Sequence, residues 1–141
     1  MAVAGCDSAQ AVKLAEMRAL VIRPEPIQRI LAGSKTWEIR RGRCLIRGLI
    51  GLVESGSGMV VGVAELNDCI GPLTLPLRIR NFRRMGITRA EAGARWPTDF
   101  YARVLRKRRR LTKPVPYTHP SGGIRWVALT PATEKAIKRQ L

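Results

Sequence analysis

The pattern of hydrophobic and polar residues changes every few positions along the first third of the chain. Residues 18–23 (RALVIR) form a short run with β-branched residues, which predicts a strand. Residues 24–33 (PEPIQRILAG) have two prolines near the start, apolar side chains at helical spacing and a final Gly33, and they predict a helix. Residues 36–40 (TWEIR) alternate, so a second strand is expected there.

The middle of the chain predicts a β-hairpin. Two apolar runs flank the turn sequence SGSG at residues 55–58, and together they place a hairpin over residues 44–68. We expect Cys44 and Cys69 to pack in strands as reduced thiols, because three scattered cysteines match neither a disulfide framework nor a zinc site. Residues 75–86 (LPLRIRNFRRMG) have a mixed pattern that predicts no single element.

Short elements are also predicted for the last part of the chain. Thr88 and Glu91 have the spacing of a capping box, so a short helix is expected to begin at Thr88. Residues 100–105 (FYARVL) and 124–129 (IRWVAL) predict strands. The proline-rich residues 112–123 (TKPVPYTHPSGG) predict a loop between them.

The order of these elements predicts an α+β fold. The strands do not alternate regularly with helices, which favours a small mixed β-barrel with two or three short flanking helices. A length of 141 residues suits one domain with a modest core. We expect residues 17–130 to form this domain, after a flexible N-terminal extension at residues 1–16 and before a C-terminal helix at residues 131–141.

The charge balance points to the kind of partner. The chain has 26 Lys and Arg against 10 Asp and Glu, a formal net charge of +16. A domain this basic favours nucleic acid, because a polyanion releases its own counterions on binding. No apolar run approaches the about 20 residues of a membrane span, and the N-terminus does not have the pattern of a secretory signal. We therefore expect a cytoplasmic monomer or weak dimer without a membrane partner.

The densest positive charge lies in the second half of the chain. Residues 78–113 contain thirteen Lys or Arg and two acids, which leaves a local net charge of +11. Such a run is often only a solvated face, but compact basic blocks are also typical of nucleic-acid-binding patches. We expect five residues to hold a nucleic-acid backbone: Arg106, Lys107, Arg108, Arg109 and Arg110.

The segment GSKTWEIR carries a motif. Gly33, Lys35, Glu38 and Arg40 follow the pattern G-x-K-x-x-E-x-R directly after the predicted helix, and this resembles the signature of the ASCH family. One bacterial and phage branch of that family is similar in two further segments, ESGSGMVVGVAEL and KPVPYTHPSGGIRWVAL.

The resemblance covers Arg18 to Leu129 and implies a PUA-like β-barrel, since ASCH domains belong to the PUA-like superfamily. It also implies a cleft lined by the signature and by the loop before the last strand, where PUA-like domains generally bind RNA or modified bases. Some ASCH proteins are reported as hydrolases, including an amidohydrolase of an acetylated cytidine nucleoside, and ribonuclease activity has been ascribed to the family. The amidohydrolase pattern has a threonine at the position of Glu38.

Strand alternation adds detail to the signature. Glu38 and Arg40 should share one face of their strand, with Lys35 at its edge, while Trp37 and Ile39 enter the core. In a cleft, Lys35 or Glu38 can transfer a proton while Arg40 stabilises a negative charge. The alternative is an ion pair between Glu38 and Arg40 that only fixes the strand.

A second candidate site lies in the loop YTHPSGG. It contains the only histidine, His119, with Tyr117 and Ser121, among glycines and prolines that let backbone amides approach a phosphate or a base. The resemblance implies that this loop faces the signature across the cleft. There Ser121 would be catalytic, and Tyr117 and His119 would bind substrate. The alternative is that His119 is an ordinary surface residue.

Together these features predict binding of RNA, either single-stranded or with a modified base, through a PUA-like cleft and the basic patch, and DNA is the alternative ligand. An enzymatic version would be a metal-independent ribonuclease. The competing hypotheses are an amidohydrolase acting on an acylated nucleoside and a non-catalytic RNA-binding module. No cofactor or metal is expected, because one histidine and scattered cysteines supply no ligand cluster.

Overall fold

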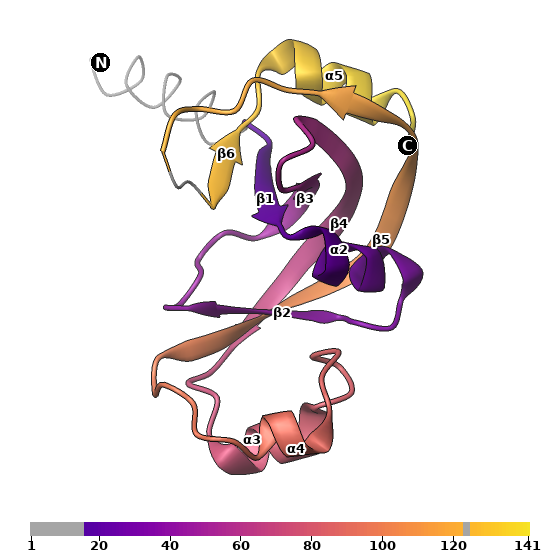
Figure 1. The fold of residues 1–141 in the computed structure, drawn as a ribbon. Helices are drawn as coiled ribbons and strands as arrows, with labels where there is room; N and C mark the ends of the chain where they lie inside the picture. The colour runs from indigo at the N-terminus through magenta and orange to yellow at the C-terminus, as the bar shows by residue number, and fades with distance from the viewer. Residues whose placement is uncertain (1–15, 123–124) are drawn as a thin grey trace, which may run out of the picture.

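The computed structural model describes residues 16–122 and 125–141 (Figure 1). The strands and helices follow in this order: β1 (Arg18–Ile22), α2 (Pro24–Ala32), β2 (Trp37–Arg41), β3 (Gly48–Glu54), β4 (Met59–Ile70), α3 (Leu75–Asn81), α4 (Arg89–Ala92), β5 (Phe100–Pro116), β6 (Trp126–Ala128) and α5 (Pro131–Lys138). The expected N-terminal extension lies outside the described residues, apart from Glu16.

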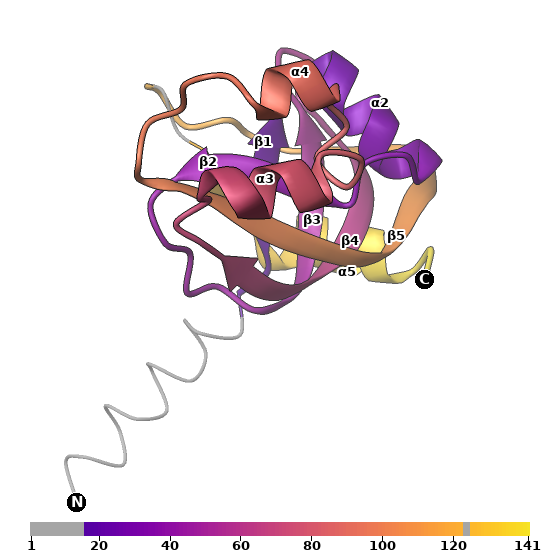
Figure 2. The same ribbon diagram turned by 90° about the horizontal axis from the view of Figure 1, so that it is seen from below.

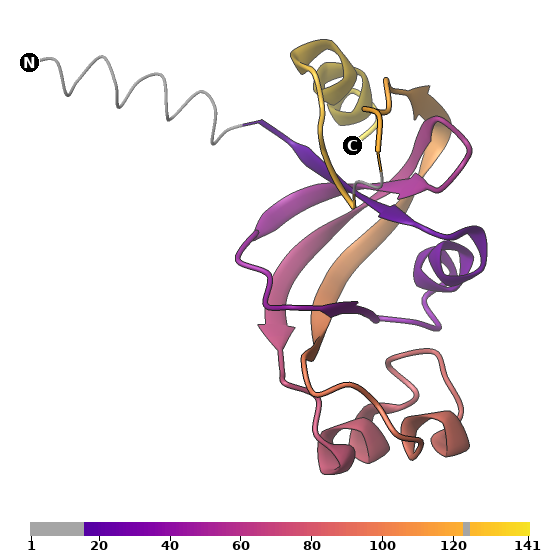
Figure 3. The ribbon, with the colours of Figure 1, turned by 60° about the vertical axis from the view of Figure 1, so that its left-hand side comes forward.

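The six strands form one mixed sheet in the order β2-β5-β4-β3-β1-β6. β1 pairs with β3 in parallel, and all other neighbours are antiparallel. β2 and β6 are therefore the edge strands, and Figure 3 shows how β3, β4 and β5 curve between them into a half-barrel. The predicted α+β class is confirmed, with four helices in the described residues instead of two or three.

Helix α2 packs on the inner face of the curved sheet. Its Ile27 and Ile30 are fully buried in one cluster with Leu20 of β1 and Leu52 of β3. Gly33 ends the helix in the left-handed conformation, with a φ of 90°, as the sequence predicted. The chain then turns directly into β2.

Smaller layers lie at the two ends of the sheet (Figures 1 and 2). At one end, Ile137 of α5 packs with Val53 and Leu111. At the other end lies the segment with α3 and α4, where Met85 packs with Trp37 of β2. The connection between β4 and β5 is therefore held beside the edge strand β2.

Helix α3 falls in the segment for which the pattern predicted no element. Thr74 caps its N-terminus by accepting a hydrogen bond from the Leu77 amide. Its inward face carries Arg78 and Asn81, which are 7% and 9% exposed. The Arg78 guanidinium donates hydrogen bonds to three backbone carbonyls of neighbouring segments. Polar residues on the buried face thus concealed the helical periodicity.

β5 continues to Pro116, so the prediction of a loop from residue 112 is wrong up to that point. Tyr117 donates its backbone N–H to the Gly58 carbonyl at the end of the β4–β5 ladder. Because hydrogen-bonded and non-bonded positions alternate along an antiparallel pair, Pro114 and Pro116 stand where an N–H would point away from β4. The missing proline donors therefore cost the ladder nothing.

Other predicted elements are present, some with shifted ends. The capping box of Thr88 and Glu91 is formed at α4. The hairpin consists of β3 and β4, but Cys44 precedes β3 and does not lie in a strand. Cys44 is nevertheless buried, and its amide donates a 3.3 Å hydrogen bond to Sγ of Cys69. None of the helices in the described residues has the length and apolar character needed to span a membrane.

Candidate functional site

A cavity of about 670 Å³ lies along the edge strand β2. Its lining comes from the end of β1, from α2, from residues 38–41 of β2, from residues 85–87, and from Trp96, Phe100 and Arg125. Sites for small organic ligands have volumes of about 300–1,000 Å³, so a molecule of nucleotide size fits here. The signature residues Lys35, Glu38 and Arg40 are all part of the lining.

The lining is strongly positive. The only carboxylate among its described residues is that of Glu38. Six cationic side chains surround it: Arg23, Arg29, Lys35, Arg40, Arg41 and Arg125. Lys35 and Arg40 were predicted as site residues. Arg41 directly follows Arg40, whereas Arg23, Arg29 and Arg125 come from other parts of the chain and belong to no recognisable motif.

Lys35, Glu38 and Arg40 form a connected ionic group. The Nζ atom of Lys35 lies 3.6 Å from Oε1 of Glu38, and both side chains are 8% exposed. Arg40 donates from Nε to Oε2 of Glu38 at 3.0 Å. Lys35 also donates to the Met85 carbonyl at 2.8 Å, so the group ties β2 to the segment before α4. The ion pair that the sequence allowed is therefore present, and it lies in the cavity wall.

Burial changes the acidity of Lys35. Desolvation of the ammonium lowers the pKa of Lys35 below the ordinary 10.5. The Glu38 carboxylate acts in the opposite direction, and the positive charges of Arg29 and Arg40 add to the lowering. A lysine in this environment gives up its proton more readily than an exposed one, which is the property that a proton-transfer group needs.

Two glycines place the Lys35 side chain. Gly33 ends α2, and the amides of Ser34 and Lys35 then donate to the carbonyl of Arg29. Gly86 has a φ of 68°, and a Cβ atom there would lie 3.2 Å from Cβ of Lys35. The segment containing Gly86 therefore packs directly against the aliphatic part of the lysine, and only glycine fits that contact without displacement.

An aromatic wall lies in the same cavity. The rings of Trp96 and Phe100 contact each other edge to face, with centroids 5.6 Å apart. Trp96 donates from its indole to the Glu91 carbonyl, and the Arg41 guanidinium lies 5.8 Å from the Phe100 centroid. Both rings pack partly against the cluster around Trp37, and both also line the cavity.

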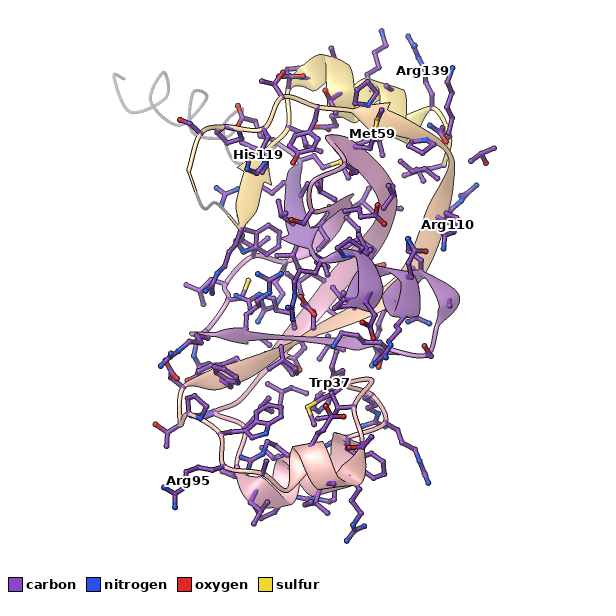
Figure 4. All side chains as sticks on the ribbon, in the orientation of Figure 1. Trp37, Met59, Arg95, Arg110, His119 and Arg139 are labelled. Atoms are coloured by element: carbon purple, nitrogen blue, oxygen red, sulfur yellow. The ribbon has the colours of Figure 1, made fainter. Side chains whose placement is uncertain are left out.

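The predicted alternation of β2 is observed. Trp37 is 4% exposed and points toward the helices α3 and α4, as labelled in Figure 4. Glu38 and Arg40 occupy the other face, while Ile39 is half-buried and also reaches the cavity. Arg103 of β5 stands directly opposite Glu38 in the register. It is 5% exposed, and its Nε and Nη1 have no hydrogen-bond partner among the described residues.

The described residues of the loop with Tyr117, His119 and Ser121, 117–122, do not contribute to the lining of this cavity. The Tyr117 hydroxyl and Nδ1 of His119 are hydrogen-bonded at 2.8 Å, and Tyr117 packs against the cluster at the α5 end. These contacts hold Tyr117 and His119 beside the cluster that contains Ile137 of α5. Arg125, which follows the loop, lines the cavity in its place. The described residues contain no group of three or more potential metal ligands.

The basic run lies on β5, outside the cavity lining. Its side chains reach neighbouring helices: Arg110 donates to the Gln28 side chain of α2, and Arg109 donates to the Gln140 carbonyl after α5. Lys107 pairs with Glu65 at 3.5 Å. In Figure 4, Arg110 and His119 lie on opposite sides of the molecule. Arg106, Lys107, Arg109 and Arg110 are exposed, and Arg108 is half-buried.

Comparison with known proteins identifies the fold. No protein-family model and no curated protein matches the chain. An ASCH crystal structure from Zymomonas mobilis is similar, with a TM-score of 0.69 and 18% identity over 88% of this chain and 94% of that one. A tyrosine-to-phenylalanine and a serine-to-alanine variant of that protein each have a TM-score of 0.68 and 18% identity over 88% of this chain, and 97% and 95% of theirs. The chain therefore has an ASCH-type, PUA-like fold.

Proposed function

We propose that the protein binds single-stranded RNA and takes one unpaired nucleotide into the cavity along β2. The main support is the lining, which combines six cations, one carboxylate and two aromatic rings. Proteins that bind single-stranded RNA use cationic grooves for the phosphates and aromatic rings for the bases. A free acylated nucleoside has no phosphate to pair with these cations, so the amidohydrolase hypothesis has less support.

Different parts of the lining would take different parts of the nucleotide. Trp96 and Phe100 offer an apolar surface for the base. Arg23 and Arg125 are exposed and carry no hydrogen bond from their side chains within the described residues, so they are available to phosphates. The ionic group around Glu38 would present polar atoms to the sugar or to the edge of the base.

The basic run would hold the RNA outside the cavity. Helix α2 connects the two regions, because Gln28 accepts from Arg110 while the next residue, Arg29, lines the cavity. A strand of RNA that crosses α2 would therefore meet positive charge on both sides of the helix. This arrangement predicts that binding weakens steeply with salt. For about five phosphate contacts, the slope of log affinity against log salt is about −3.5.

A metal-independent ribonuclease is the second candidate, and the environment of Lys35 favours it. Lys35, whose pKa is lowered, would accept the proton of a 2′-hydroxyl that attacks the phosphate. The P–O5′ bond would break to leave a 2′,3′-cyclic phosphate, and the leaving 5′-oxygen would take a proton from water. Arg40 would stabilise the charge that develops on the phosphate. Ser121, His119 and Tyr117 remain proposed contributors only if their loop moves toward bound RNA.

Binding is tested with fluorescently labelled single-stranded RNA at several salt concentrations, without metal, by anisotropy. Arg125→Ala is expected to weaken binding roughly tenfold, since hydrogen bonds to charged groups contribute about 1.5–3 kcal/mol. Arg95→Ala is the matched control: it removes the same charge from an exposed site outside the cavity lining, and Figure 4 labels it. Equal losses for the two variants would contradict binding in the cavity.

Cleavage is tested in the same samples by gel electrophoresis of the RNA. A ribonuclease predicts fragments that disappear with Lys35→Ala, while circular dichroism shows that the variant is folded. If the wild-type protein binds the RNA and the RNA stays intact, the protein is a non-catalytic binding module. Cleavage that persists in Lys35→Ala assigns the chemistry to another residue or to a contaminating nuclease.

A further inference from the structure

The cavity follows the free edge of a β-strand. β2 lies at one edge of the sheet and pairs only with β5 among the described residues. Four consecutive residues of this strand, 38–41, line the cavity. The backbone of β2, and not only its side chains, is therefore available to a ligand at this edge.

The hydrogen-bond pattern shows which backbone groups face outward. Thr36 accepts from the Leu105 amide and Gly42 donates to the Asp99 carbonyl, so both positions are bonded to β5. The register between them has no bulge, and bonded positions alternate in an antiparallel ladder. Glu38 and Arg40 are therefore bonded to β5 as well. The intervening residues turn their N–H and C=O groups away from the sheet.

Trp37 has the same phase as Ile39 and Arg41, and its N–H is used outside the sheet. It donates to the Arg84 carbonyl at 2.9 Å, and the same carbonyl accepts from the Thr36 amide at the entrance of the strand. The next outward position is Ile39, which lines the cavity, followed by Arg41. The N–H and C=O groups of Ile39 thus form an adjacent donor and acceptor at the edge of β2 that the cavity follows.

We propose that the backbone N–H and C=O of Ile39 pair with the Watson–Crick edge of the RNA base that enters the cavity. This inference rests on the proposed function and deepens it. Every base has a donor beside an acceptor on that edge. The backbone pair of Ile39 therefore distinguishes unpaired from paired bases better than it distinguishes one base from another. A base inside a duplex has this edge occupied, which selects single strands.

The alternative occupant of a free strand edge is a peptide strand, and the surroundings favour a nucleotide. Strand addition needs a row of free backbone groups. β2 has five residues, and the outward N–H of Trp37 is already bonded to Arg84, so only Ile39 and Arg41 offer free outward pairs within the described residues. The six cations of the lining complement phosphates, and the aromatic wall complements a base.

The ligand side of the test compares oligouridine with an oligomer of N3-methyluridine of equal length. The methyl group blocks the Watson–Crick donor and leaves the phosphates and the ring face in place. We expect a loss of affinity of roughly tenfold or more, the usual range for a two-point contact to a base edge. Equal affinities would overturn the proposal.

The protein side removes the donor itself. Replacing Ile39 by its α-hydroxy analogue, through nonsense suppression, substitutes an ester oxygen for the N–H and keeps the side chain. Affinity for oligouridine should fall several-fold, while affinity for the N3-methyl oligomer, whose methyl group keeps the whole base edge away from the Ile39 backbone, should not fall further. Ile39→Ala, which keeps the N–H and shortens the side chain, is the control. Equal effects of the ester on both oligomers would overturn the proposal.

The same experiment separates this inference from the proposed function. If both oligomers bind equally and Arg125→Ala weakens both, the cavity binds RNA without the backbone contact, and only the inference fails. If neither oligomer binds, or if Arg125→Ala and Arg95→Ala behave alike, the proposed function fails and the inference falls with it.

Discussion

The guanidinium of Arg40 on β2 donates a 2.7 Å hydrogen bond from Nη2 to the carbonyl oxygen of Val21 on β1. These two strands are not neighbours in the sheet. The bond therefore crosses the open side of the half-barrel, and with the contact to Glu38 it makes Arg40 a bridge between the two walls of the cavity. A residue of the signature thus fixes the width of the site as well as its charge.

Loss of this bridge should destabilise the fold. Arg40→Ala leaves the buried Glu38 with Lys35 as its remaining partner and removes the link to Val21. We expect the free energy of unfolding to fall by roughly 1–3 kcal/mol in urea denaturation, as for loss of a charged hydrogen bond. Arg41→Ala, which removes an exposed arginine from the same strand, is the control and should have a smaller effect.

Removal of the Glu38 carboxylate alone should lower the free energy of unfolding more than removal of Glu38 together with Lys35. Glu38→Ala leaves Lys35 and Arg40 without their shared partner, next to the buried Arg103. A loss of roughly 3–5 kcal/mol is typical when one member of a buried pair is removed. The double variant Lys35→Met with Glu38→Met should be less destabilised by at least ~1 kcal/mol. A double variant that is less stable than Glu38→Ala would show that the lysine has a stabilising role independent of Glu38.

The contact between Gly86 and Lys35 predicts a steric effect. Gly86→Ala and Gly56→Ala both place a side chain at positive φ, which costs about 1 kcal/mol each. A Cβ at Gly56 meets nothing within 4 Å, whereas one at Gly86 meets Lys35. Urea denaturation should therefore show a larger loss for Gly86→Ala, and RNA affinity should fall only in that variant. If Gly86→Ala and Gly56→Ala lose the same stability and the same RNA affinity, the contact between Gly86 and Lys35 has no role in the site.

The sequence predicted the local parts of this site better than its assembly. Helix α2, its Gly33 end and the alternation of β2 follow from capping and periodicity over a few residues. Those signals placed Glu38 and Arg40 on one face correctly. Trp96, by contrast, lies against the guanidinium of the buried Arg78 of α3, which is 5.0 Å from its ring centroid, and no apolar pattern indicates that contact.

Contacts between segments far apart in the chain explain why the position of the loop with His119 could not be predicted. The loop with His119 was expected opposite the signature from the resemblance, but Tyr117, hydrogen-bonded to His119, packs against the cluster that contains Ile137 of α5. Arg125 entered the lining instead, next to Val21, whose amide donates to the Arg125 carbonyl. Such pairings between distant segments leave no trace in local spacing.

The burial of Lys35 predicts a pH dependence of stability. The pKa of Lys35 is lowered by desolvation in the folded protein, while the unfolded chain has the ordinary value of 10.5. Between these two values the unfolded state binds more protons, so the free energy of unfolding contributed by this residue rises with pH. In urea denaturation from about pH 8 to about pH 10, the wild-type protein should gain stability relative to Lys35→Met.

The control for this titration is Lys113→Met, which removes one exposed positive charge and leaves the buried group intact. The free energy of unfolding of the wild-type protein minus that of Lys35→Met should increase with pH, and more steeply than the corresponding value for the control. A decrease of this value with rising pH would mean that the pairing with Glu38 outweighs burial and raises the pKa of Lys35. In that case Lys35 would give up its proton less readily than an exposed lysine, and its place in the site would be to hold phosphate and not to accept a proton.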